Sequence, residues 1–117
     1  MLSHGEDLSS PESTLQGYLS CFETSDEKCV LTHYHGIKSY YIGEPHVTEF
    51  KVTKKVIYLE ADAKSWNNSG IVPSAKVGDV ELEVLQKTRN VEGKYSYNLR
   101  KFGSQWLIYS HSAWGAP

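Results

Sequence analysis

The sequence predicts one domain of the α+β class, with helices first and an antiparallel sheet after them. The chain has 117 residues, close to the commonest length of a domain. Apolar residues recur at helical spacing before residue 36, and from Val47 onward they alternate with polar ones. We therefore expect N-terminal helices packed on a strongly bent antiparallel sheet of four to six strands. Residues 1–10 are expected to form a flexible arm, and residues 11–117 the domain.

A first helix is predicted from residue 11. Ser9 and Glu12 have the spacing of a capping box, and Pro11 suits a first helical turn. The apolar face that follows has the spacing of an amphipathic helix: Leu15, Tyr18, Leu19 and Phe22.

A second helix is expected to follow, capped by Ser25 or Asp26 and ended by Gly36. Its apolar stripe consists of Cys29, Val30, His33 and Tyr34.

Residues 47–63 are predicted to be extended, with a bend, bulge or turn at Lys54 and Lys55. Phe50, Val52, Val56 and Tyr58 would share one face, and Ile57, Leu59, Ala61 and Ala63 the other. Turn-forming residues then predict a loop over 67–78, which could be a lid or a plain connection.

Three further runs complete the predicted meander. The first covers residues 80–91 and is expected to end in a hairpin turn at Glu92 and Gly93. The second carries alternating Tyr95, Tyr97 and Leu99, and Gly103 with Ser104 turns the chain into the last strand. On that strand, simple alternation places Trp106, Ile108 and Trp114 on one face and Leu107, Tyr109, His111 and Ala113 on the other.

Charge and hydropathy exclude some classes of function. The formal net charge is −2, so no broad basic field is available to bind nucleic acid. No stretch approaches the roughly 18 apolar residues of a membrane span, so direct membrane insertion is not expected. The first seven residues lack the pattern of a signal peptide. Two locations stay open: cytoplasmic, or extracytoplasmic after removal of a leader.

The two cysteines, Cys21 and Cys29, lie eight residues apart on either side of the predicted helix junction. A helical hairpin can bring such positions within disulfide distance, which would indicate an oxidising compartment. The other interpretation is a pair of buried thiols. On a helix, His33 and His35 point in different directions and do not readily share a metal ion, so no metal site and no cofactor are expected.

Two segments of the chain resemble the nuclear-transport-factor-2-like superfamily, an α+β cone. They are the opening Ser10-Pro11-Glu12-Ser13 with the helix residues Leu15 to Phe22, and the closing hairpin from Tyr95 to Ile108. The superfamily includes ketosteroid isomerase, scytalone dehydratase, SnoaL-like cyclases and small bacterial exported domains of unknown role. The resemblance implies a pocket between the sheet and the first helix, and pairing of two copies through the sheet face.

Aromatic residues with polar ends are candidates to line that pocket for a small apolar ligand. They are Tyr18, Tyr34, Tyr40, Tyr41, Trp66, His111 and Trp114. Candidates for acid–base chemistry are Asp62, His111 and Tyr18. Glu60 and Asp62 would share one face of a strand, where solvated charges are the preferred interpretation.

The resemblance does not extend to a catalytic carboxylate. After the second helix, Tyr34-His35-Gly36-Ile37-Lys38 contains no Asp or Glu where the isomerases carry their base. We therefore expect a non-catalytic domain that binds a small ligand in the cone or a protein partner, as a homodimer through the sheet face or as part of an exported or membrane-associated protein. The alternative is a SnoaL-like isomerase, cyclase or dehydratase that acts on a small apolar substrate.

Overall fold

A computed structural model describes residues 7–21, 27–36, 47–70, 75–88 and 91–114 of the chain. Its elements, in order, are α1 (Pro11–Ser20), α2 (Glu27–His33), β1 (Val47–Ile57), α3 (Glu60–Ser69), β2 (Val80–Thr88), β3 (Val91–Phe102) and β4 (Gln105–Trp114). The strands form one antiparallel open sheet in the order β1-β2-β3-β4. The predicted α+β class is confirmed.

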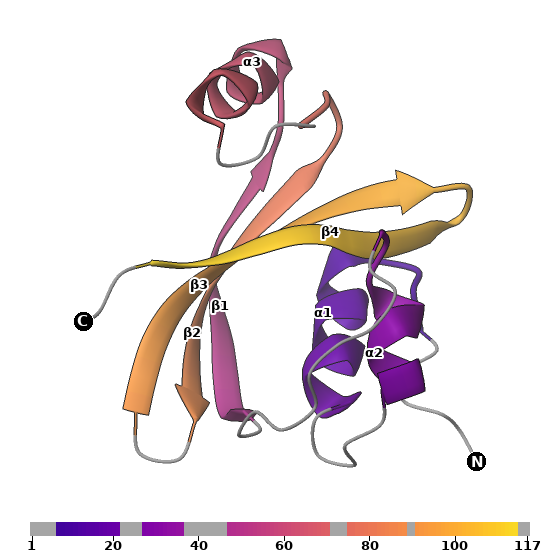
Figure 1. Cartoon of the computed structure of the whole chain (residues 1–117), viewed down its shortest axis with the longest axis vertical. Helices are drawn as coiled ribbons and strands as arrows, with labels where there is room; N and C mark the ends of the chain where they lie inside the picture. The colour runs from indigo at the N-terminus through magenta and orange to yellow at the C-terminus, as the bar shows by residue number, and fades with distance from the viewer. Residues whose placement is uncertain (1–6, 22–26, 37–46, 71–74, 89–90, 115–117) are drawn as a thin grey trace.

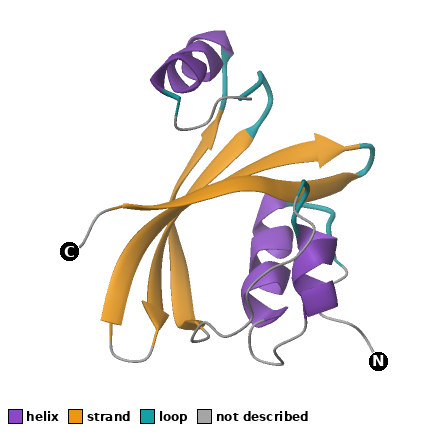
Figure 2. Cartoon of the chain, in the orientation of Figure 1, coloured by secondary structure: helices purple, strands orange, loops and turns teal. Residues whose placement is uncertain are grey.

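The sheet is twisted, with α1 and α2 at one side and α3 at the opposite end (Figures 1 and 2). None of the helices in the described residues is long and apolar enough to cross a membrane.

The first helix begins at Pro11 as predicted, but its N-cap lies one residue later than the predicted Ser9. Ser10, not Ser9, is the N-cap: its hydroxyl accepts from the Ser13 N–H at 3.1 Å, and the Ser10 N–H donates to the Ser13 hydroxyl at 3.2 Å. Pro11 takes the first helical position, where a missing N–H costs nothing. The predicted pair Ser9 and Glu12 therefore does not form the capping box, which consists of Ser10 and Ser13.

The second helix ends at His33, before the predicted stop at Gly36, and Tyr34 lies beyond the helix. Val30, His33 and Tyr34 are buried, and Gly36 follows with a φ of +92°, a conformation that glycine adopts without strain. Tyr34 then forms a parallel bridge with Ile108, and the His35 N–H donates to the Ile108 carbonyl at 2.7 Å. These contacts join the end of α2 to the edge strand β4. The predicted caps Ser25 and Asp26 lie outside the described residues.

A disulfide between Cys21 and Cys29 joins α1 to α2, with the two Cα atoms 5.5 Å apart. Of the two interpretations left open by the sequence, the structure contains the disulfide. The bond closes a loop with a sequence separation of 8.

Reducing this disulfide is expected to lower the free energy of unfolding by about 2–3 kcal/mol, because the unfolded chain regains the entropy of an open loop. The thermal midpoint should fall by on the order of 10 °C. Thermal unfolding followed by circular dichroism, with and without a phosphine reductant, measures this change. A variant with both cysteines replaced by serine should not respond to the reductant. An unchanged midpoint in wild type with two titratable thiols would contradict the prediction.

The main core lies between the helix pair and the sheet. It is built from α1, α2 and the inward residues of three strands, and its fully buried members include Leu15, Val30, Leu82, Leu99 and Ile108. Leu8 is also buried, and its carbonyl accepts from the Trp106 N–H at 2.8 Å. The end of the expected N-terminal arm therefore contacts β4, while residues 1–6 lie outside the described residues.

The strand β3 begins earlier than predicted, at Val91. Glu92 and Gly93 lie within β3, opposite Lys87 and Gln86, so the prediction of a turn there is wrong. The register has a physical reason: it pairs the inward apolar residues across the two strands, as in Leu82 with Tyr97. The predicted turn at Gly103 is confirmed, with a φ of +67°.

Residues 60–69 form the helix α3, so the predicted continuation of the strand to residue 63 is wrong. The Asp62 carboxylate accepts from the Leu59 N–H at 2.9 Å, and Gly70 ends the helix with a φ of +79°. The acidic first turn and the closing glycine are both helix signals. Glu60 and Asp62 therefore do not share one face of a strand, and the predicted loop over 67–78 begins only after Ser69.

The helix α3 covers a second, smaller apolar cluster. Tyr58, Ala63 and Ala75 are buried there, with Trp66 and Tyr109 packed against them. This packing explains why the segment is helical: helical spacing brings Ala63 and Trp66 to one side, which alternation would not. The predicted irregularity at Lys54 is confirmed by a register shift between Val52 and Lys54.

Candidate functional site

Four aromatic side chains from four segments meet on the helix-facing side of the sheet. Tyr18 comes from α1, Tyr34 follows α2, Tyr97 comes from β3 and His111 from β4; we call them the tyrosine–histidine cluster. Neighbouring ring centroids lie 5.6–5.9 Å apart. The three tyrosines are buried and His111 is exposed. The cluster therefore combines buried aromatic surface with one ring that reaches water.

Hydrogen bonds orient the polar ends of this cluster. The Tyr34 hydroxyl and the His111 Nδ1 are 2.8 Å apart. The Tyr97 hydroxyl donates to the side-chain oxygen of Gln86, which is itself buried. Two phenols thus have defined partners, and the imidazole is held edge-on to the Tyr34 ring at an interplanar angle of 82°.

A bulge in β4 places His111 in the cluster. Leu99 pairs with Ile108, whereas the preceding Asn98 pairs with Ser110, so Tyr109 is an extra residue in β4. Ile108 and His111, which pairs with Tyr97, therefore lie on the same face although they are three residues apart. The predicted alternation placed them on opposite faces and is wrong beyond the bulge.

The structure brings together three of the predicted site residues, Tyr18, Tyr34 and His111. Asp62 and Trp66 do not join them, because both lie on α3 beside the second apolar cluster. Tyr40, Tyr41 and the side chain of Trp114 lie outside the described residues.

Two further members of this region, Tyr97 and Gln86, were not predicted as site residues. Gln86 continues the alternation of Val80, Leu82 and Val84, so its position on the inward face could have been predicted. Its burial could not, because that depends on the elements packed above it.

The opposite face of the sheet carries a buried polar network around Glu81. The Tyr58 hydroxyl donates to one carboxylate oxygen of Glu81 at 3.0 Å, and the Ser96 hydroxyl donates to the other at 3.1 Å. The Asn98 amide donates to the Tyr58 hydroxyl at 2.8 Å. All four residues are buried, and their side chains hydrogen-bond to one another.

Asp79 forms the second half of the network. Arg100 donates to both carboxylate oxygens, from Nε at 2.9 Å and from a terminal nitrogen at 2.8 Å. The Tyr109 hydroxyl donates at 2.6 Å and the Lys76 N–H at 2.9 Å. The Arg100 guanidinium also lies 4.3 Å from the centre of the Tyr109 ring. Asp79 is only 2% exposed, so this ion pair lies largely out of water.

The network keeps its phenols neutral. Burial raises the pKa of Tyr58 and of Tyr109 well above the usual range, and the neighbouring Glu81 and Asp79 raise them further. The hydrogen bonds to Asp79 raise the pKa of the Arg100 guanidinium. Each oxygen of both carboxylates accepts at least one hydrogen bond. Both acids are therefore engaged in holding the sheet, Tyr58 and Tyr109 together.

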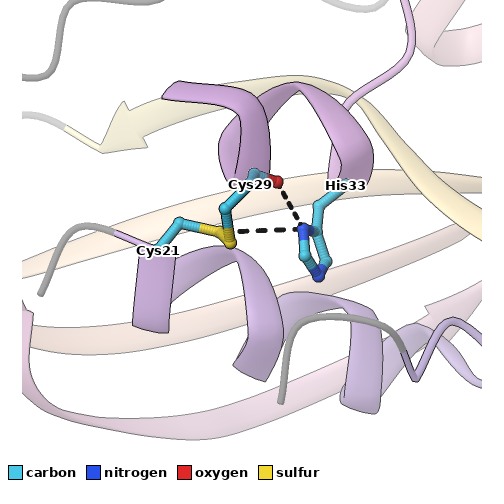
Figure 3. A group of neighbouring side chains, drawn as sticks. All are labelled: Cys21, Cys29 and His33. Carbon is cyan, nitrogen blue, oxygen red and sulfur yellow. Dashed lines mark hydrogen bonds between the residues drawn. A yellow bond between two sulfur atoms is a disulfide. The ribbon is translucent and has the colours of Figure 1, made fainter. Parts of the chain in front are cut away.

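Two other features of the molecule lie apart from this cluster and this network. A shallow surface hollow of about 250 Å³ lies near the ends of β1 and β2, lined by Glu49, Phe50, Lys51, Leu85, Lys87 and Glu92. It contains none of the predicted site residues. Among the described residues, Cys21, Cys29 and His33 form a group whose ligand atoms all lie within 4.8 Å of one another (Figure 3).

Fold and site together define an α+β domain with an aromatic and polar cluster between its helix pair and its sheet. Comparison of the chain with known protein families, with curated proteins and with solved structures found no match.

Proposed function

We propose that this chain is a non-catalytic binding domain that takes a small, largely apolar ligand against the tyrosine–histidine cluster. The observation that carries the proposal is the meeting of three buried tyrosines with one exposed imidazole on the helix-facing side of the sheet. Aromatic walls with a few fixed polar groups are typical of small-molecule sites.

The chemistry of the cluster suggests the ligand class. Tyr18 and Tyr97 form the buried apolar part of the cluster, while Tyr34 and His111 form a polar pair at its exposed side. An aromatic or alicyclic compound with one hydrogen-bonding group would suit this arrangement. The buried carboxylates Asp79 and Glu81 belong to the network on the other face, which supports binding rather than acid–base catalysis.

The nuclear-transport-factor-2-like cone is proposed as the fold family. Two helices precede an antiparallel meander, and the candidate cluster lies between them, as the resemblance implies. The helix α3, inserted between the first two strands of the sheet, was not part of that expectation.

The disulfide supports a place for this domain in an exported protein. Structural disulfides persist in oxidising compartments and are rare in the cytosol. Cys21–Cys29 therefore favours the extracytoplasmic location over the cytoplasmic one.

Binding is expected to depend on the exposed side of the cluster. With 1-anilinonaphthalene-8-sulfonate as a fluorescent probe, wild type should show saturable binding, and His111→Ala should weaken it about tenfold, or about 1.4 kcal/mol. The reason is that the variant removes one aromatic ring of the proposed site and the hydrogen-bond partner of Tyr34. His35→Ala is the matched control, because His35 stacks on Phe102 instead. Equal affinities of the two variants would contradict the proposal.

The alternative function, a SnoaL-like enzyme, has one observation in its favour. The Tyr34–His111 hydrogen bond is an arrangement that can transfer a proton. Asp62 does not support it, since its carboxylate caps α3. Exchange of the α-protons of a cyclic ketone for solvent deuterium, followed by NMR, distinguishes the two. Exchange above background that is lost in His111→Ala would favour the enzyme.

A homodimer through the sheet face is the proposed assembly. Exposed apolar side chains support an interface at the end of the sheet where β1 ends and β2 begins. Ile57 and Leu59 lie at the β1–α3 junction, and Val77 precedes β2. The two regions are joined by the Gly78 N–H, which donates to the Tyr58 carbonyl at 2.9 Å. Sedimentation over a range of concentrations tests this assembly, and a monomer at all concentrations would leave these residues to a different protein partner.

A further inference from the structure

The disulfide lies beside a histidine that the tyrosine–histidine cluster does not use. Cys21 follows α1, while Cys29 and His33 lie one turn apart on α2 (Figure 3). Cys21 and His33 are each 1% exposed, and Cys29 is half-buried. Three potential ligands of a soft metal ion thus lie together where the two helices meet.

The imidazole of His33 is incompletely satisfied. Its Nδ1 lies 2.7 Å from the Cys29 carbonyl oxygen, and since a carbonyl only accepts, Nδ1 carries the proton. The Nε2 atom is then an acceptor, and it is buried without a hydrogen-bond partner. The ring nitrogen that faces the sulfurs is Nδ1 and not this unpartnered Nε2, so Nδ1 is the candidate metal ligand.

We propose that the reduced form of the chain binds a thiophilic divalent metal ion, such as Zn²⁺, through Cys21, Cys29 and His33. This inference is independent of the proposed ligand-binding function. In the oxidised form the sulfurs are bonded to each other and are not available as thiolate ligands.

The spacing fits such a site. A tetrahedral zinc ion with bonds of about 2.3 Å to sulfur and about 2.0 Å to nitrogen separates a sulfur and a nitrogen ligand by about 3.5 Å. The Cys21 Sγ and the His33 Nδ1 are 3.7 Å apart. The two sulfurs need only move apart by side-chain rotation once their bond is broken. Two thiolates balance the charge of a divalent ion, so the buried site would carry no net charge.

The chemistry balances as follows. A phosphine reductant breaks the S–S bond and becomes a phosphine oxide by taking the oxygen of one water molecule, whose two hydrogens go to the sulfurs. Metal binding then displaces both thiol protons to solvent. His33 stays neutral: its proton leaves Nδ1, which binds the metal, and Nε2 takes up a proton.

Titration with Co²⁺ under anaerobic conditions tests the proposal, because tetrahedral thiolate coordination gives intense visible bands. Reduced wild type should bind one ion per chain, and the oxidised protein none. His33→Ala should weaken binding at least tenfold, whereas His35→Ala, a neighbouring exposed histidine, should bind like wild type.

Circular dichroism on the same samples shows whether the metal ion binds in a folded site or only to the thiolates of an unfolded chain. Should reduction unfold the chain, Zn²⁺ must restore the helical signal in wild type and fail to do so in His33→Ala. The proposal is overturned by absence of one-to-one binding in the reduced protein, by equal affinities of wild type and His33→Ala, or by metal binding without recovery of the fold.

Discussion

Replacing Asp79 by asparagine is expected to lower the free energy of unfolding by about 3 kcal/mol or more. The substitution keeps the size of the side chain but removes the charge that pairs with Arg100. Breaking a buried ion pair by removing one partner typically costs about 3–5 kcal/mol, because the other charge is left without compensation. Arg100 is 19% exposed at its side chain, which favours the lower end of this range.

Urea unfolding of wild type and Asp79→Asn measures this effect through the shift of the midpoint. Glu49→Gln is a matched control, because Glu49 pairs with Lys87 at 3.6 Å on the exposed surface, where an ion pair contributes less than about 1 kcal/mol. In a double variant with Arg100→Met, part of the lost stability should return. A loss in Asp79→Asn no greater than in Glu49→Gln would show that the network contributes little to stability.

Alkaline pH is expected to destabilise the protein steeply through Tyr58 and Tyr109. Burial raises the pKa of both phenols in the folded state above the value of about 10 in an unfolded chain. Their contribution to stability is therefore fully present below pH 10. It is lost as the pH rises toward the folded-state pKa values, because the unfolded state releases its phenolic protons first. Each group contributes a slope of up to about 1.4 kcal/mol per pH unit.

The free energy of unfolding in urea, measured at a series of pH values from 8 upward, tests this expectation. Phenolate absorbance reports in parallel which tyrosines ionise before the chain unfolds. A variant with both Tyr58→Phe and Tyr109→Phe should be less stable at neutral pH but should lose stability less steeply above pH 10. The interpretation fails if the free energy of unfolding falls with pH equally steeply in wild type and in this variant above pH 10.

Local signals predicted much of the fold. The proline at position 11 and the apolar spacing of Leu15 and Tyr18 act within a few residues, and α1 forms where these signals lie. The second helix also forms, although it ends at His33, before Gly36. The alternation of Val80, Leu82 and Val84 likewise predicted β2.

The helix α3 was not predicted, because the alternation of apolar residues along β1 continues past the start of the helix. Leu59, Ala61 and Ala63 suited a strand face as well as Ala63 and Trp66 suit a helix face. Contacts with Ala75 and Tyr109, which lie further along the chain, favour the helix over a strand for this segment.

The candidate site could be predicted only in part, because it too depends on contacts between residues that are distant in sequence. Tyr18, Tyr34 and His111 were expected to line one pocket, and the structure places their rings together. His111 reaches that face only through the bulge at Tyr109, which nothing in the local sequence specified. The buried acids Asp79 and Glu81 were not predicted as a network, because alternation assigns them to a face that would be solvent-exposed without its cover of α3, Tyr58 and Tyr109.

By itself, the sequence determined the α+β class, the first two helices and most of the strands, since caps, turns and hydrophobic periodicity act over a few neighbouring residues. The tertiary structure decided the helix α3, the register that moved the β2–β3 turn, and the bulge that turns His111 inward. It also decided the partnership of Cys21 with Cys29 and of Asp79 with Arg100. These features depend on which distant side chains become neighbours and lose water together, and that free energy exists only once the helices and the sheet have packed.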